Sequence, residues 1–402
     1  MCRGYACDKP SRRYQGRVGM TYSGFVTGIL ALLLIGGSAY TVLAFFCVAE
    51  FFSKGRRRPD RKTFPPVSIL KPVKGFDPGF RRNLESFCRQ DYPEYEVIIG
   101  FVGEDDEAIP AAKALAGSYP DKVRVVITRE TIGANEKVSN LKGLIAAAKY
   151  SLVAVSDCDM KVDGWYVRTI VEEYMSEDNV GMVTSPYRIS SPATVGAALE
   201  SLAIAVDFIP SVLVARKLEG ITFGLGASML FSVESLAEAG GLVPIADYLA
   251  DDYQVGNRIA KGGSRVLLSR YVLEDTNVEI DVFTHLSHQV RWARTYYASR
   301  PGGYFGYGIT HPFFFACLFV LLQGPTAASL SAVCGVLALR ISLAALVHKK
   351  MIRKKGWLKW AVLLPVRDLL AFGIWAWSFA GRRVSWRGRR YRVEKGGKIT
   401  RA

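Results

Sequence analysis

The stretch LVAVSDCD, residues 152–159, decides the fold of this chain. Its first four residues are apolar and form a short run, which indicates a buried strand. Two carboxylates, Asp157 and Asp159, follow where that strand ends. In open α/β sheets, ligands bind at the carboxyl ends of the parallel strands. The stretch therefore predicts an α/β sheet with an acidic, ligand-binding edge.

The residues before this stretch alternate between strand-like and helix-like segments. Strands and helices are predicted in turn at 67–70, 84–90, 95–102, 108–119, 122–128 and 138–150. The last of these helices has Ser139 or Asn140 near its start. Such alternation is typical of a parallel sheet flanked by helices, and we assign residues 65–300 to one α/β domain.

Asp157 and Asp159 are the predicted metal ligands. Two carboxylates one residue apart in a loop can share a divalent ion, and Mg²⁺ and Mn²⁺ prefer carboxylate and phosphate oxygens. Such an ion would neutralise a diphosphate leaving group. A pair of aspartates is also common in plain surface turns, and this alternative is weakened by the strand that precedes Asp157.

A second acidic pair, Asp251 and Asp252, precedes a helical stretch at 255–260. One interpretation is that these carboxylates merely cap the helix. The other is that they are catalytic, with one acting as the general base that removes a proton from an acceptor hydroxyl. A glycine-rich segment at 220–241 lies just before the pair. Its glycines either let the backbone approach a ligand closely or form ordinary turns.

A third cluster is the stretch HQVRWAR, residues 288–294. On a helix, His288, Arg291 and Trp292 share one face. Arginine suits bidentate contact with phosphate, and tryptophan can stack on a ring. The alternative is a basic amphipathic helix at a bilayer surface, with Trp292 as its interface anchor. His285 and His288 as a metal site is a third and weaker interpretation.

The composition combines hydrophobicity with positive charge. Of 402 residues, 50% are hydrophobic and 12% aromatic, yet the net charge is +16. This combination favours contact with anionic membrane surfaces or with diphosphates. Nucleic acid is not an expected partner, because the basic residues lie beside apolar runs rather than in an aromatic-interleaved groove. The seven cysteines have no zinc spacing and indicate no disulfide framework, which fits a reducing, cytosolic face.

Apolar segments at both ends predict a multi-pass membrane protein. After an N-terminal tail, residues 1–21, the uncharged run 22–48 is long enough to span a bilayer. Basic residues follow it at 54–62, which places the domain on the cytoplasmic face by the positive-inside rule. A cleaved signal peptide is the alternative, although its apolar core would be shorter.

Further apolar segments follow within and after the domain. The segment 197–215 carries Glu200 and Asp207, so we expect an interfacial or domain-core helix there rather than a span. Residues 303–380 are expected to form transmembrane or interfacial helices, with a hairpin turn at Gly324-Pro325. A basic tail, 381–402, ends the chain, and its side of the membrane depends on whether 358–379 crosses.

Taken in order, these motifs resemble the ceramide glucosyltransferase family, including its bacterial hopanoid-associated branch. The resemblance covers about residues 65–300, with a weaker echo at 386–391. The matching strings are long, and several recur in the same order: VSILKPVKG (67–75), NLESF (83–87), DYP (91–93), 133–141, 156–162, 246–253 and Arg291-Trp292.

The resemblance implies a GT-A nucleotide-sugar domain and a reaction that inverts the anomeric centre. It implies that Asp157 and Asp159 hold the metal and uridine diphosphate. Asp252 would be the base and Lys137 would contact the donor. His288, Arg291 and Trp292 would form the family's arginine–tryptophan signature, although its first position is usually Gln or Arg.

One further departure concerns the uracil contact. The family usually has an aspartate where this chain has Gly103, and we expect Asp105 to substitute for it. The expected partners are thus a UDP-sugar donor and a membrane lipid acceptor in the bilayer, either ceramide or a hopanoid. The expected activity is transfer of glucose or N-acetylglucosamine. The alternatives are a processive polysaccharide synthase of the cellulose or hyaluronan kind, and a non-catalytic protein that binds acidic lipid.

Overall fold

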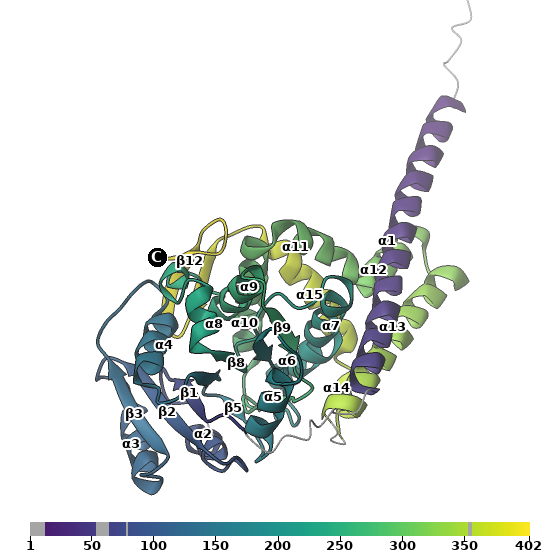
Figure 1. Ribbon diagram of the computed structural model, residues 1–402. Helices are drawn as coiled ribbons and strands as arrows, with labels where there is room; N and C mark the ends of the chain where they lie inside the picture. The colour runs from purple at the N-terminus through teal and green to yellow at the C-terminus, as the bar shows by residue number, and fades with distance from the viewer. Residues whose placement is uncertain (1–12, 54–63, 78, 353–355) are drawn as a thin grey trace, which may run out of the picture.

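The computed structural model describes residues 13–53, 64–77, 79–352 and 356–402 (Figure 1). Its centre is a seven-stranded sheet in the order β3-β2-β1-β4-β8-β6-β9. The strands are β1 (Val67–Pro72), β2 (Tyr95–Val102), β3 (Val123–Thr128), β4 (Leu152–Val155), β6 (Val180–Thr184), β8 (Met229–Ser232) and β9 (Arg265–Leu268). All neighbouring strands pair in parallel except β8, which is antiparallel to both β4 and β6. The predicted α/β sheet is confirmed, with this one antiparallel strand as the exception.

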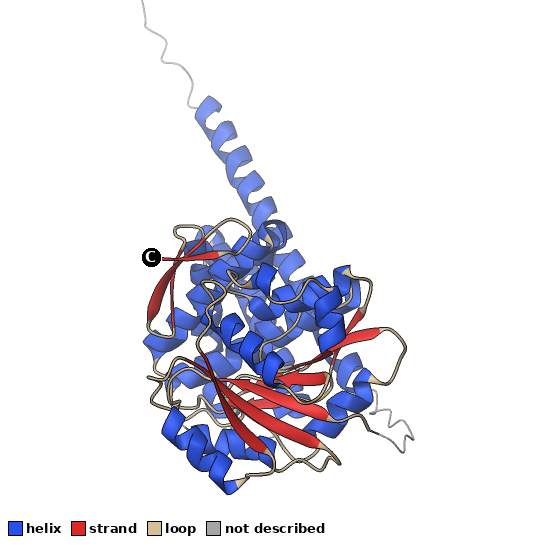
Figure 2. Cartoon of the chain, turned by 60° about the vertical axis from the view of Figure 1, so that its left-hand side comes forward, coloured by secondary structure: helices blue, strands red, loops and turns tan. Residues whose placement is uncertain are grey.

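Helices cover both faces of the sheet (Figure 2). The helices of this domain are α2 (Phe80–Cys88), α3 (Ile109–Ser118), α4 (Glu136–Ala147), α5 (Tyr166–Tyr174), α8 (Val233–Glu238), α9 (Asp251–Lys261) and α10 (Val282–Ser299). Buried residues of α2, α3 and α5 pack on one face, while those of α4, α8 and α9 pack on the other. The side chains of β1 and β2 alternate between these two cores, as the period of two in a strand requires.

Helix α4 begins earlier than its apolar pattern predicted. Its first residue is Glu136, because the side chain of Asn135 caps it by accepting a hydrogen bond from the Lys137 amide at 2.9 Å. Ser139 and Asn140, which we expected near the start, are buried inside the first turns instead. Asn140 donates to the Gly100 carbonyl at 2.8 Å, which ties α4 to β2.

Two small sheets complete the domain. One has the order β5-β10-β7 and consists of β5 (Met160–Lys161), β10 (Leu273–Asp275) and β7 (Tyr187–Arg188). The other is formed by the basic tail, as β11 (Arg383–Trp386), β12 (Arg389–Val393) and β13 (Ile399–Arg401). The sequence analysis did not predict these strands, because the four buried apolar side chains of the tail occur between charged residues; they pack with Leu249 of the domain.

Long apolar helices stand beside the domain (Figure 1). Helix α1 (Arg13–Ser53) is continuous and includes the predicted anchor, while the basic run 54–62 lies outside the described residues. Helices α12 (Pro312–Gln323) and α13 (Ala327–Val347) form the predicted hairpin at Gly324-Pro325, and both contact α1. By length and composition three described helical segments can cross a membrane: 24–53, 195–218 and 327–352.

The first of the helices that we expected within 303–380 is broken. It forms α11 (Pro301–Tyr307), a short 3₁₀ turn (Gly308–Thr310) and then α12, with a bend of 55° between the two halves. The break falls at His311-Pro312, because proline disfavours helical geometry in the residue before it. Counting this bent pair as one span raises the number of candidate spans to four.

The segment expected at 197–215 is a domain-core helix and is not exposed at an interface. It runs as α6 (Val195–Ala203), a π-helical turn (Ile204–Phe208) and α7 (Ile209–Leu218), and 89% of its apolar window is buried. Its charges are paired: Glu200 contacts His285, and Asp207 contacts Arg340 and Arg367. This pairing offsets the free-energy cost of removing these charges from water, which had argued against burying the segment.

The basic tail packs against the α/β domain. Residues 358–379 form α14 (Leu358–Ala361) and α15 (Leu364–Ser378), and neither is long enough to cross a membrane. A π-helical turn (His348–Ile352) before them touches the domain, where Arg188 donates to the Met351 carbonyl. After α15, the tail pairs with the domain through the hydrogen bond from the Ile399 amide to the Asp247 carbonyl, at 2.6 Å.

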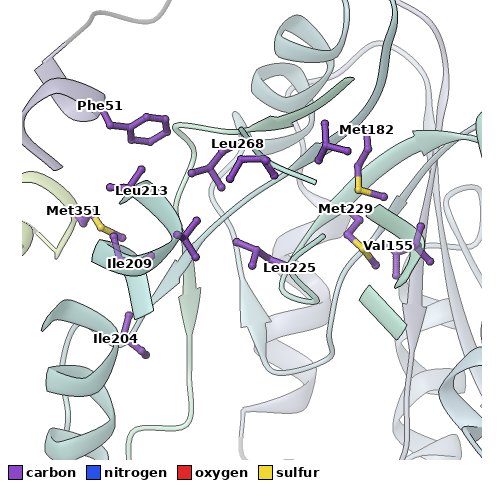
Figure 3. Packing of buried hydrophobic residues seen from close by; sticks show 14 of the residues in the cluster. Phe51, Val155, Met182, Ile204, Ile209, Leu213, Leu225, Met229, Leu268 and Met351 are labelled. Carbon is purple, nitrogen blue, oxygen red and sulfur yellow. The ribbon is translucent and has the colours of Figure 1, made fainter. Parts of the chain in front are cut away.

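One hydrophobic core joins the apolar helices to the sheet (Figure 3). It contains Phe51 from the end of α1, Leu213 from α7 and Met351 from the π-helical turn His348–Ile352. The same core continues through Leu225 to Val155, the last residue of β4. Because these residues share one close-packed cluster, the edge of the sheet is held at a fixed position relative to the end of α1.

Candidate active site

A cavity of about 1500 Å³ opens at the carboxyl ends of β1, β2 and β4. The loop after β4 and the first turn of α9 form its acidic wall, and α10 forms the opposite wall. Eight of the nine predicted site residues line it: Lys137, Asp157, Asp159, Asp251, Asp252, His288, Arg291 and Trp292. Residues up to 155 positions apart in the sequence therefore line the same cavity, as the topology of a parallel sheet allows.

Asp157 and Asp159 leave β4 side by side. Asn277 donates to Oδ2 of Asp159 at 3.1 Å, whereas Oδ1 is buried and has no hydrogen-bond partner among the residues that the structure describes. Burial and the neighbouring Asp157 raise the pKa of Asp159 to about 6. A buried carboxylate oxygen without a donor is costly, so this pair has the character of a site for a cation.

Lys137 lies between the two acidic pairs. Its Nζ is 2.7 Å from Oδ1 of Asp157 and 3.6 Å from Oδ2 of Asp251. Burial opposes its charge, but these two carboxylates and Asp252 raise the pKa of Lys137 above its ordinary value. The cap residue Asn135 fixes this arrangement, because its side chain also donates to the Tyr248 carbonyl at 2.7 Å, just before the second pair.

Asp252 is positioned by backbone amides. The Gly226 amide donates to its Oδ2 at 2.7 Å, and the Tyr253 amide donates to its Oδ1 at 2.8 Å. Burial and the adjacent Asp251 raise the pKa of Asp252 to about 6. The residue before α9 is Ala250 and makes no side-chain cap, so Asp252 is not the N-cap of this helix.

The glycine-rich segment brings backbone against this carboxylate. A Cβ atom at Gly226 would lie 3.1 Å from Oδ2 of Asp157 and 3.2 Å from Oδ2 of Asp252. One at Gly224 would lie 2.7 Å from the Asp252 carbonyl oxygen. These two glycines therefore serve close approach, while Gly240 and Gly241 have positive φ angles of 91° and 70°, as turns require.

His288, Arg291 and Trp292 share one face of α10, as predicted. The His288 and Trp292 rings stack with centroids 6.3 Å apart, and the Arg291 guanidinium carbon is 5.9 Å from the Trp292 ring centroid. Burial lowers the pKa of Arg291, which is typical of a cation held in a site that an anion would complete. This face of α10 lines the cavity.

The carboxylates fit a divalent cation. Asp157 and Asp159 supply the hard oxygen ligands that Mg²⁺ and Mn²⁺ prefer, and the unpartnered Oδ1 of Asp159 is available for one. Within the described ranges, no group of three or more His, Cys, Asp and Glu side chains could hold an ion, so a diphosphate would have to supply further ligands. His285 does not line the cavity, and its Nδ1 contacts the buried Glu200.

Asp105 is misplaced by the sequence interpretation. It is exposed and lies outside the residues that line the cavity, whereas its neighbour Asp106 lines it. Asp106 accepts hydrogen bonds from the Gly75 amide at 2.9 Å and the Ala108 amide at 3.0 Å, which turn its side chain inward. Gly103 has a φ of 79°, so the chain turns just before these aspartates, and Asp106 rather than Asp105 lines the cavity.

Several site residues escaped the sequence interpretation. Lys71 is fully buried and donates to the Asp157 carbonyl, and burial lowers its pKa to about 8. Asp77, Asp275, Trp386 and Arg387 also line the cavity. Lys71 lies within the matching string at 67–75 and Asp77 lies two residues after it, so the string was a usable signal. Asp275 had no signal, because it stands alone in a short strand.

Toward α7, α11 and α15 the cavity is lined mainly by apolar and aromatic side chains, with the charged Asp207 and Arg367 among them. The apolar and aromatic residues from these helices and from the π-helical turn Ile204–Phe208 are Ile204, Phe208, Val212, Tyr304, Tyr307, Ala371, Ile374 and Trp375. The cavity thus joins an acidic wall to a largely apolar region. This combination suits a ligand that is charged at one end and hydrophobic at the other.

A model of glycosyl transferase family 21 matches residues 29–399. Ceramide glucosyltransferase 1 from Caenorhabditis elegans is 28% identical over 280 residues, which cover 67% of this chain and 59% of that protein. Ceramide glucosyltransferase 3 from the same organism is 28% identical over 260 residues, which cover 63% and 56%. The chain therefore spans less than two thirds of the length of these relatives.

Among solved structures, the chain is similar to the mannosyltransferase PcManGT from Pyrobaculum calidifontis, in complex with GDP-Man and Mn²⁺. The TM-score is 0.52 at 18% identity, and the match covers 87% of this chain and 99% of that one. At this identity the similarity concerns the fold alone. It confirms the predicted GT-A architecture.

Proposed function

This chain belongs to glycosyl transferase family 21, and from that premise we propose that it moves a hexose from a UDP-sugar to the hydroxyl of a membrane lipid. One observation carries the proposal: a single cavity joins Asp157, Asp159, Asp252 and Arg291 to a largely apolar region beside the long helices. A nucleotide sugar needs the first part, and a lipid needs the second.

The donor would bind along the acidic wall. Asp157 and Asp159 would hold Mg²⁺ or Mn²⁺, which supplies positive charge to the diphosphate leaving group. Arg291 faces the same space and would contact phosphate oxygens, while the stacked Trp292 would shape the sugar pocket. Lys137 would hold Asp157 in place at 2.7 Å, and Asp106 would take the role expected of Asp105 near uracil.

Asp252 would be the base that removes the proton from the acceptor hydroxyl. Its two backbone hydrogen bonds fix the carboxylate, and its raised pKa of about 6 makes it a better proton acceptor than an ordinary aspartate. Asp251 would act as a positioning residue, because it binds Asn135 and lies near Lys137. Direct attack by the hydroxyl would invert the anomeric centre without a covalent intermediate.

The acceptor would reach the site from the bilayer along α7. Phe208, Val212 and Ala215 of this segment line the cavity, and Leu213 packs with Phe51 of α1. Ceramide and a hopanoid polyol both combine an apolar body with a hydroxyl. Glucose and N-acetylglucosamine are both compatible with a pocket bordered by His288 and Trp292.

We also propose that the domain lies on the cytoplasmic face. Helices α1 and α13 both end beside it, where Phe51 and Met351 enter the same core. Lys349 and Lys350 follow α13 at that end, and a basic cluster there favours the cytoplasm. The beginning of α1 would lie on the opposite side, with α12 entering and α13 returning as a hairpin.

The function is tested with membranes from an expressing strain and with labelled UDP-glucose, UDP-N-acetylglucosamine and GDP-mannose. We expect one UDP-sugar to label a lipid, identified by mass spectrometry of the extract after addition of ceramide or a hopanoid polyol. EDTA should abolish the product, and Mn²⁺ or Mg²⁺ should restore it. Labelled polysaccharide in place of lipid would instead indicate a processive synthase, and product formation in EDTA would contradict the metal site.

The pH dependence of the reaction should reflect Asp252. Burial and Asp251 raise its pKa to about 6, and only the ionised carboxylate can accept a proton. We therefore expect kcat/KM to be constant above pH 7 and to fall about tenfold per unit below pH 6. The profile is measured at saturating Mn²⁺, so that Asp159 stays ionised. A profile that stays flat down to pH 5 would contradict the role of Asp252.

A further inference from the structure

The basic tail folds back over the site. Strands β11 and β12 pair antiparallel and are joined by Arg387 and Gly388. Tyr391 of β12 is buried with Leu249, which lies two residues before Asp251. Glu136 at the start of α4 contacts both Arg389 and Arg401. The tail is therefore fixed to the two segments that carry Lys137 and the second acidic pair.

The turn of this hairpin has an unusual residue at its tip. Arg387 has a φ of 48°, followed by Gly388 with a φ of 75°. Two-residue hairpins favour positive φ at both positions, where Asn, Asp and Gly are the common residues. An arginine at the first position is strained, and such strain is retained when the side chain has a separate use.

The Arg387 side chain points to the acidic wall of the cavity. Its Nη1 is 2.9 Å from Oδ1 and 3.0 Å from Oδ2 of Asp77, and its Nη2 is 3.6 Å from Sγ of Cys158. Cys158 is the residue between Asp157 and Asp159. Arg387 lines the cavity and is 34% exposed, so part of its guanidinium faces open space.

We propose that Arg387 is a diphosphate-binding residue of the donor site, brought there by the tail. The inference rests on the proposed function. A diphosphate held at Asp157 and Asp159 has its oxygens next to Cys158, which is where the guanidinium lies. Asp77 holds the arginine in position, and Arg291 approaches from α10 on the opposite wall. Two guanidinium groups then clamp one diphosphate, as planar forks suit phosphate oxygens.

The test compares UDP with UMP in the purified full chain, in detergent with saturating Mn²⁺. Calorimetry should show that Arg387→Gln weakens UDP by about tenfold or more and UMP by less than about twofold, because only UDP carries the second phosphate. Arg387→Lys should recover part of the loss, since it keeps the charge without the fork. Arg390→Gln, an exposed change on the same hairpin, should match the unchanged chain.

The outcomes separate this inference from the function on which it rests. Equal weakening of UDP and UMP, or unchanged UDP affinity in Arg387→Gln, overturns the role of Arg387 and leaves the proposed function intact. The first of these results would mean that Arg387 only attaches the tail through Asp77. If the unchanged chain binds neither nucleotide, the proposed function fails, and the role of Arg387 falls with it.

Discussion

Asp252→Asn should lower kcat by about 10²–10⁴-fold while leaving UDP affinity nearly unchanged. The substitution keeps the shape of the side chain, and its oxygen can still accept from the Gly226 amide that lies 2.7 Å from Oδ2. It removes the capacity to take a proton from the acceptor. Initial rates with labelled UDP-sugar and calorimetry with UDP and Mn²⁺ measure the two quantities on the same preparation.

Asp247→Asn is the matched control. Asp247 lies five residues earlier in the same loop, is exposed, and accepts from the Ala134 amide at 2.8 Å, which an asparagine can also do. It does not line the cavity within the described residues, so its loss of charge should change kcat by less than about threefold. A similar loss of rate in both variants would assign the effect to the loop and would sink the role of Asp252 as base.

Arg340→Met should destabilise the protein by about 3–5 kcal/mol, which corresponds to a fall in thermal midpoint of about 10 °C. Arg340 is 1% exposed and donates to Asp368 at 2.7 and 2.8 Å and to Asp207 at 2.9 Å. Without it, two buried carboxylates share a single cation, Arg367. Thermal unfolding in detergent micelles, followed by intrinsic fluorescence, gives the midpoint.

The double variant Arg340→Met with Asp368→Asn separates charge from packing. It leaves one buried pair, Arg367 with Asp207, so the charges balance again. Much of the lost stability should return, because the cost of breaking a buried pair comes mainly from the uncompensated partner. A single variant that unfolds within about 2 °C of the unchanged chain would show that this network contributes little.

The same network connects the apolar helices α13 and α15 to the segment beside the cavity. Arg340 belongs to α13, and Arg367 and Asp368 belong to α15. Asp207 belongs to the π-helical turn Ile204–Phe208 beside the cavity. From sequence, the charge of Asp207 counted against a membrane-spanning segment, because it was considered without its partners. Replacing Asp207 by leucine would therefore test stability rather than lipid entry, since it removes the partner of two buried arginines.

Local patterns were sufficient for most of the fold. The strand at 95–102 was predicted with the bounds that the structure has, and the hairpin at Gly324-Pro325 was predicted from two breaker residues. These features depend on side chains that are neighbours in the chain. The antiparallel strand β8 was not predicted, because its partners β4 and β6 are distant in the sequence. The tail strands were not predicted, because arginines interrupt their short apolar patterns.

The sequence by itself determined the α/β sheet, the apolar helices and the acidic residues at the strand ends. Periodicity of two or 3.6 residues and an acidic pair after a strand are legible without knowing the fold. Only the tertiary structure decided which acid faces the cavity, that Asp207 meets Arg340 from 133 positions away, and that Arg387 meets Asp77 from 310 positions away. Charge pairing acts through space over a few ångströms, so its partners are chosen when the chain folds.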